Sequence, residues 1–195
     1  MKHGIADLVF ECFTDEAREW YSPLKPYTLL EYQWVRDNLK LTNETIVIDA
    51  GCHHGNYSVV FKPAFVIAID VNQEYLNYAA MNMASNEMDF MIICKRLGEN
   101  GVRTDFIVDI YKIDIEGDEF KLLPNEIDLY PHVHTWIVEV HPKYGNPEII
   151  AKYFLDRKFS LLKVDRDTMR VRKYVPDEKW NGHATLIARK STDNS

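Results

Sequence analysis

The sequence has little cysteine and no long apolar run. Its three cysteines, Cys12, Cys52 and Cys94, are widely spaced and include no Cys-x-x-Cys pair, which excludes a disulfide framework and a structural zinc motif. No apolar run approaches the roughly 18 residues that a membrane span needs. Acidic Asp7 and Glu11 interrupt the first apolar stretch, so we expect no signal peptide. Together these absences predict a soluble, cytoplasmic protein.

Basic residues are in the minority. The chain has 23 Lys and Arg against 30 Asp and Glu, a formal net charge of −7 over 195 residues. This balance disfavours a broad nucleic-acid-binding face, because neutralising phosphates takes concentrated Lys and Arg. The length fits a single domain with one substantial core. We expect a helical cover over residues 1–44, a core over 45–190 and a frayed tail over 191–195.

The elements predicted along the chain indicate an α/β fold. Apolar residues at helical spacing predict helices over residues 5–13 and 28–39. From residue 45 onward, strands are expected over 46–48, 65–69, 90–94, 110–115, 136–140, 160–164, 169–175 and 184–188, and helices over 56–61, 74–84, 118–123 and 148–156. Apolar strands alternating with helices are typical of a doubly wound, mostly parallel sheet covered on both faces. The last strands suggest an antiparallel closing hairpin.

A glycine turn follows the first of these strands. The segment at residues 47–58 reads Val-Ile-Asp-Ala-Gly-Cys-His-His-Gly-Asn-Tyr-Ser. Gly51 permits a sharp turn and close approach of a ligand to the backbone, and Gly55 lets a helix start beneath that ligand. The pattern is neither the dinucleotide fingerprint nor a P-loop. Acidic Asp49, placed before the first glycine, would repel a pyrophosphate.

Asp70 ends the next strand, where a carboxylate can accept hydrogen bonds from two ribose hydroxyls. S-adenosylmethionine is a nucleoside that carries positive charge and no phosphate, and it suits such a site. We therefore predict that S-adenosylmethionine is the cofactor. Its predicted binding residues are Asp49, Gly51, Cys52, Gly55 and Asp70.

Two later strand ends carry acidic residues and a histidine. Asp114 and Glu116, in Lys-Ile-Asp-Ile-Glu-Gly-Asp-Glu-Phe at residues 112–120, would share one strand face, as would Glu139 and His141, in Ile-Val-Glu-Val-His-Pro at 137–142. If the two strands are neighbours, all four line one rim of the sheet. They are the candidate catalytic residues, and His141 has a suitable pKa for a general base. We assign no metal site, although this cluster could also hold a divalent ion through oxygen ligands and one imidazole.

These three segments resemble signatures of the FkbM family of S-adenosylmethionine-dependent methyltransferases. The resemblance covers roughly residues 45–142. It implies the class I methyltransferase fold, a seven-stranded, mostly parallel sheet with a reversed C-terminal strand, and O-methylation of a hydroxyl on a small-molecule or sugar-like acceptor. The chain departs from the family at Cys52, His53 and His54, where a small residue and Asn are usual, and at Asp70, which replaces the more common Glu.

Two other functions stay open. The chain could be a non-catalytic, nucleoside-binding Rossmann-like module that serves as an interaction partner. It could also be an RNA methyltransferase, which the net charge disfavours. The aromatic residues of the N-terminal segment, among them Tyr21 and Tyr32, would form either a lid over the cofactor or part of the core.

Overall fold

The computed structural model describes residues 8–21, 24–97, 101–166, 168–178, 180 and 182–190. The chain folds into two compact units, residues 1–96 and 97–195. The organisation of the chain as a single domain stays a prediction. The tail expected over 191–195 and the start of the helix expected over 5–13 lie outside the described residues.

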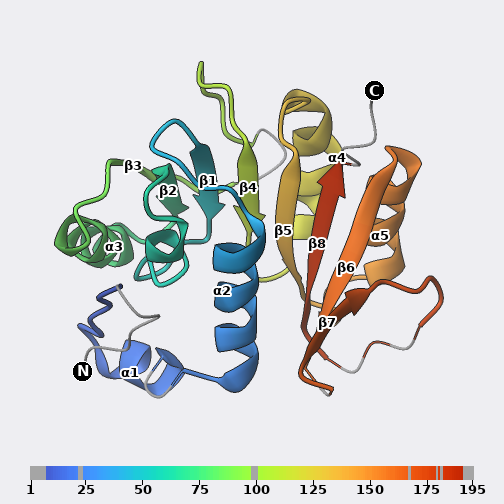
Figure 1. Ribbon diagram of the computed structural model, residues 1–195, viewed down its shortest axis with the longest axis horizontal. Coiled ribbons are helices and arrows are strands. Elements are labelled where there is room, and N and C mark those ends of the chain that lie inside the picture. Colours follow the sequence, from blue (N-terminus) through green and yellow to red (C-terminus); the bar gives the residue numbers. More distant parts are fainter. Residues whose placement is uncertain are drawn as a thin grey trace. The chain divides into compact units, whose positions relative to one another are not determined.

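Unit 1 contains three parallel strands in the order β3-β2-β1 (Figure 1). They are β1 (Ile46–Ala50), β2 (Phe65–Asp70) and β3 (Phe90–Cys94). The strands β1 and β2 are buried along almost their whole length, which explains their continuous apolar sequences. Helix α3 (Gln73–Ser85) packs on β2 and β3. It begins after Asn72, whose side chain accepts a hydrogen bond from the N–H of Glu74.

The N-terminal part of unit 1 differs from the prediction. Helix α2 (Pro26–Asn38) matches the helix expected over 28–39, but residues 8–13 are not helical. Helix α1 (Asp15–Tyr21) begins instead after Thr14, whose hydroxyl accepts the N–H of Ala17 at 3.0 Å. The side chains of Asn82 in α3 and of Asn86, the residue that follows α3, accept the N–H groups of Glu11 and Val9, each at 2.8 Å. The main chain before α1 therefore forms no helix, and the side chains of Asn82 and Asn86 hold it by hydrogen bonds instead.

Unit 2 contains five strands within the described residues, in the order β4-β5-β8-β6-β7. They are β4 (Ile110–Ile113), β5 (Thr135–Val140), β6 (Phe159–Asp165), β7 (Arg170–Lys173) and β8 (Ala184–Lys190). Strands β4 and β5 are parallel, whereas β8 runs antiparallel to both β5 and β6 and lies between them (Figure 1). The reversed C-terminal strand is thus confirmed. Strand β7 forms a hairpin with β6 and adds an eighth described strand to the seven that the resemblance implied.

Two helices accompany these strands, α4 (Glu119–Leu129) and α5 (Pro147–Asp156). Helix α5 packs against β6 and against α4. In the core of unit 2, the ring of Trp136 stacks on Tyr111 with centroids 4.9 Å apart and contacts Phe154 at 5.9 Å. None of the helices in the described part of the chain has the length and apolar character that a membrane crossing requires.

Candidate functional site

The glycine turn after β1 is tied to the end of β2. The N–H groups of Gly51 and Cys52 both donate to the carbonyl oxygen of Ile69, at 2.8 and 3.0 Å. Gly51 and Gly55 each have a φ of 75°, a left-handed conformation that glycine adopts without steric cost. The turn therefore has the sharp geometry that its glycines predict.

Gly55 is required by the packing of α3. A Cβ atom added to Gly55 would lie 2.9 Å from both the Cα and the Cβ of Ala79. The sequence predicts a helix over 56–61, but only the short 3-10 helix η1 (Ser58–Phe61) follows the turn. Gly55 therefore allows α3 to pack closely against the glycine turn.

Two of the predicted cofactor residues have buried side chains. The carboxylate of Asp49 is fully buried, and its Oδ2 accepts a hydrogen bond of 2.6 Å from the Ser58 hydroxyl. The side chain of Cys52 is also buried. Asp49 therefore connects β1 to η1 through a buried hydrogen bond. The role of Asp49 and Cys52 in binding a cofactor stays a prediction.

Asp70 lies half-buried at the end of β2 and holds the glycine turn. Its Oδ2 accepts the N–H of His53 and its Oδ1 accepts the N–H of Asn72, both at 2.9 Å. An ionised carboxylate has about four lone-pair sites, so each oxygen can accept a further hydrogen bond. A half-buried carboxylate beside a glycine turn fits the two hydroxyls of a ribose.

Aromatic side chains from α1 and α3 pack around the turn. The hydroxyl of Tyr21 lies 3.0 Å from Nδ1 of His53. The His53 ring stacks on His54, with centroids 4.4 Å apart, and meets the edge of Tyr75 at 4.2 Å. Tyr32, in contrast, is buried in the core. The core interpretation therefore applies to Tyr32, whereas a lid over the cofactor stays a prediction.

His54 is fully buried beneath these rings. Its two ring nitrogens have no hydrogen-bond partner among the described residues. Burial, together with the neighbouring His53, lowers the pKa of His54 to about 4. Its imidazole is therefore neutral near pH 7.

The second group of candidate residues gathers where β4 and β5 end. The two strands are paired in parallel, so the neighbourhood expected from the sequence is confirmed. Strand β4 ends at Ile113, and Glu116 has a left-handed φ of 52°. Asp114 and Glu116 therefore lie beyond the strand, with Glu116 in a turn, and their predicted position on a strand face is wrong. Both carboxylates still face His141, whose Nε2 is 3.8 Å from Oδ1 of Asp114 and 3.7 Å from Oε2 of Glu116.

Sequence reasoning missed Glu119, which fixes the orientation of His141. Oε1 of Glu119 lies 3.0 Å from Nδ1 of His141 and accepts the backbone N–H of the same residue at 2.9 Å. Its Oε2 accepts the N–H of Gly117 at 2.7 Å. Both side chains are buried. Because a carboxylate only accepts, Nδ1 carries the proton and Nε2 presents its lone pair to Asp114 and Glu116.

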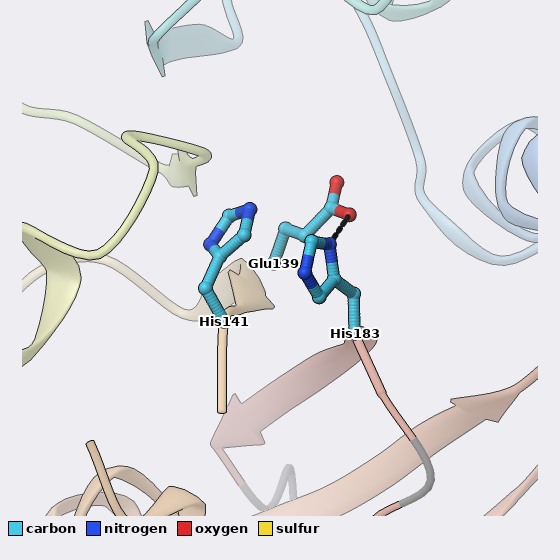
Figure 2. A group of neighbouring side chains, drawn as sticks. All are labelled: Glu139, His141 and His183. Atoms are coloured by element: carbon cyan, nitrogen blue, oxygen red, sulfur yellow. Dashed lines mark ion pairs between the residues drawn. The ribbon is translucent and has the colours of Figure 1, made fainter. Parts of the chain in front are cut away.

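His183 is a second residue that no motif indicated. It lies just before β8, and its ring meets the ring of His141 edge to face, with centroids 4.6 Å apart. Its Nδ1 is 3.9 Å from Oε1 of Glu139 (Figure 2). The same oxygen of Glu139 accepts a hydrogen bond of 2.6 Å from Arg166. The antiparallel pairing of β8 with β5 brings His183 to this cluster.

The ionisation of the cluster reflects this crowding. Desolvation and the charge of Glu139 raise the pKa of Asp114 to about 7. Desolvation alone would raise the pKa of Glu139 as well, but the charge and hydrogen bond of Arg166 hold it below its usual value. Burial disfavours a charged His141, yet the hydrogen bond and the charge of Glu119, together with the charge of Asp114, raise its pKa overall. The cluster therefore contains groups that exchange protons near neutral pH.

Comparison with known proteins finds similarity in structure alone. The sequence matches no protein-family model and no curated protein. An rRNA methylase from Streptococcus thermophilus is 15% identical, with a TM-score of 0.58 over 86% of this chain and 98% of that chain. An S-adenosylmethionine-dependent methyltransferase from Clostridium acetobutylicum is 14% identical, with a TM-score of 0.58 over 87% and 94%.

A third structure of this kind is an S-adenosylmethionine-dependent O-methyltransferase from Thermotoga maritima. It is 14% identical, with a TM-score of 0.57 over 85% of this chain and 66% of that chain. At such identities the likeness concerns the fold. The chain therefore has the α/β fold of class I methyltransferases, with a mostly parallel sheet and a reversed strand, and this prediction is confirmed.

Proposed function

We propose that the chain is an S-adenosylmethionine-dependent methyltransferase of the FkbM type. It acts on a hydroxyl of a small-molecule or sugar-like acceptor, and we also propose that it is cytoplasmic. The hydroxyl oxygen attacks the methyl carbon, the bond between sulfur and methyl breaks, and S-adenosylhomocysteine leaves. The hydroxyl proton passes to the protein or to water. The class I methyltransferase fold and the three sequence signatures support this proposal.

The observation that carries the cofactor assignment is the position of Asp70. Its carboxylate is half-buried beside the glycine turn, and both oxygens already hold backbone N–H groups in place. Oriented in this way, they can receive two ribose hydroxyls at little entropic cost. An acidic turn also suits a sulfonium better than a phosphate.

We assign the acceptor side to Asp114, Glu116, Glu139 and His141. Their carboxylates and imidazole can bind a hydroxyl and take up its proton, a contribution of about 10²–10⁴-fold. The pKa of Asp114 is raised to about 7, and that of His141 is raised above its usual value. Both groups therefore suit proton transfer near neutral pH.

The test is calorimetric titration of the full chain with S-adenosylmethionine and with S-adenosylhomocysteine. Asp70→Asn keeps the size of the side chain but removes its charge and an acceptor oxygen. We expect it to weaken binding by about 10–100-fold, because hydrogen bonds to charged groups are worth about 1.5–3 kcal/mol each. The matched control is exposed Asp89→Asn. No binding to the wild type at high micromolar ligand, or equal binding by the two variants, overturns the assignment.

A methyl-transfer screen with a cofactor labelled on the methyl group would identify the acceptor. RNA belongs in this screen, because a similar structure is an rRNA methylase. Labelled RNA would favour the RNA methyltransferase alternative, against the expectation from the net charge of −7. Binding of the cofactor without transfer to any acceptor class would favour the non-catalytic module.

A further inference from the structure

We propose that Asp114, Glu116 and His141 bind a divalent transition-metal ion. Nε2 of His141, Oδ1 of Asp114 and Oε2 of Glu116 all lie within 4.8 Å of one another. An imidazole combined with carboxylates suits zinc, manganese or iron, whereas magnesium prefers ligands that are all oxygen. Binding of the ion by these residues does not depend on the proposed function.

The hydrogen bond from His141 to Glu119 is the first argument. It places the proton on Nδ1, so the lone pair of Nε2 faces two carboxylate oxygens. Three electron-rich atoms that converge in this way repel one another unless a positive charge lies between them. A histidine ligand whose other nitrogen donates to a carboxylate is a recurring arrangement in metal sites. Glu119 and His141 are both buried, which holds this geometry in place.

The distances argue for an ion rather than for a proton. A protonated Nε2 would form charge-assisted hydrogen bonds of about 2.7–2.9 Å. The observed separations from Asp114 and Glu116 are 3.8 and 3.7 Å. Ligands at about 2.0–2.2 Å from a tetrahedral ion lie about 3.3–3.6 Å from one another. The Asp114 and Glu116 side chains would therefore each have to move toward His141 by a few tenths of an ångström to close this shell, and Glu116 is an exposed side chain.

Two lysines lie beside these carboxylates. Nζ of Lys112 is 3.7 Å from Oδ2 of Asp114, the oxygen that is not proposed as a ligand. Nζ of Lys143 is 3.8 Å from Oε2 of Glu116, which is a proposed ligand atom, but Lys143 is an exposed side chain that an ion can displace. Oε1 of Glu139 accepts a hydrogen bond of 2.6 Å from Arg166, so we do not count Glu139 among the three proposed ligands. Figure 2 shows Glu139 and His183 beside His141.

His183 lies where a further ligand would stand. Its ring contacts the ring of His141 with centroids 4.6 Å apart, and His183, His141 and Glu139 offer ligand atoms that lie within 4.8 Å of one another. A site with three protein ligands and a position shared by His183 and solvent has the composition of catalytic metal sites. In a methyltransferase, a consequence that rests on the proposed function, the bound ion would replace proton uptake by Asp114 and His141. It would lower the pKa of the acceptor hydroxyl, whose proton would pass to water.

The experiment measures metal binding directly. Full-length protein is stripped with a chelator and titrated with Co²⁺, whose visible absorption reports coordination, and with Zn²⁺ by calorimetry. We expect one ion per chain. His141→Ala should abolish binding, and Asp114→Asn and Glu116→Gln should each weaken it by at least about 10-fold. His132→Ala, at an exposed histidine in the same unit, should bind as the wild type does.

If the buried His141 cannot be replaced without unfolding the protein, Glu116→Gln tests the metal site instead. The Glu116 side chain is 70% exposed, so its replacement should not disturb the fold. No binding to the wild type at about 1 mM metal, or wild-type affinity in both carboxylate variants, overturns the proposal. A titration with S-adenosylhomocysteine runs in parallel. Metal binding without cofactor binding would refute the proposed function and leave the metal site standing. Cofactor binding without metal binding would refute the metal site and leave the proposed function standing.

Discussion

A single oxygen of Glu119 accepts both the backbone N–H and the Nδ1–H of His141, at 2.9 and 3.0 Å. This double contact fixes the imidazole in one rotamer and one tautomer. The side chain of Glu119 is fully buried, so its charge acts on His141 with little screening by water. Glu119 is therefore a positioning residue for the cluster at the ends of β4 and β5.

Replacement of Glu119 by Gln should lower the pKa of His141, because it removes the negative charge that raises it and leaves only a neutral amide oxygen as the acceptor. Turnover and metal affinity should each fall by about 10–100-fold, as for other residues that orient a histidine ligand. Histidine NMR titration measures the pKa, and calorimetry measures the metal affinity. Exposed Glu74→Gln is the control. An unchanged pKa of His141 would show that the contact only supports the fold.

Gly55→Ala tests the packing of the glycine turn. The new Cβ would lie 2.9 Å from the backbone of Ala79, and overpacking of this kind costs about 1–3 kcal/mol. Gly182→Ala is a matched control, because Gly182 has a φ of 93° but no atom within 4 Å of the added Cβ. Urea unfolding should therefore show the greater loss of stability for Gly55→Ala. Equal losses would mean that backbone strain alone explains both values.

Asn82→Ala should release the N-terminal segment from α3. The Asn82 amide accepts the N–H of Glu11 at 2.8 Å and donates to the carbonyl oxygen of His54 at 2.9 Å. Its loss leaves buried groups unpaired, at a cost of about 1–3 kcal/mol. Hydrogen exchange should accelerate at the Glu11 amide, and the exposed Asn77→Ala should not produce this change. Unchanged exchange would mean that other contacts hold the segment.

The buried His54 should make stability depend on pH. Its pKa is about 4 in the folded protein and about 6.5 in the unfolded chain. The unfolded state therefore binds more protons between these values, and stability should fall as the pH drops from about 6.5 to about 4. His54→Leu removes this contribution, so the loss in free energy of unfolding between pH 7 and pH 5 should be smaller than in the wild type. His132→Ala, at an exposed histidine, should retain the wild-type pH dependence. An equal pH dependence for His54→Leu and the wild type would exclude His54 as its source.

Much of the fold is visible in the sequence because it depends on local patterns. Apolar runs rich in β-branched residues mark β1 and β2, and the glycine turn follows β1 as expected. Residues 8–13 show why such patterns can fail. Their apolar spacing predicts a helix, but the side chains of Asn82 in α3 and of Asn86 just after it bind their main chain instead. Partners far along the chain leave no trace in a local pattern.

The candidate site divides in the same way. The sequence shows acidic residues and His141 near the ends of two predicted strands. Because the carboxyl ends of parallel strands gather at one edge of a sheet, it also predicts that these residues lie close together. Their hydrogen bonds and the orientation of His141 are visible in the folded structure alone. Glu119 reads as an ordinary acidic residue in the first turn of a helix, and His183 stands alone before β8. The packing of α4 and the antiparallel insertion of β8 bring both to His141, because hydrogen-bond geometry depends on distances in space and not on spacing along the chain.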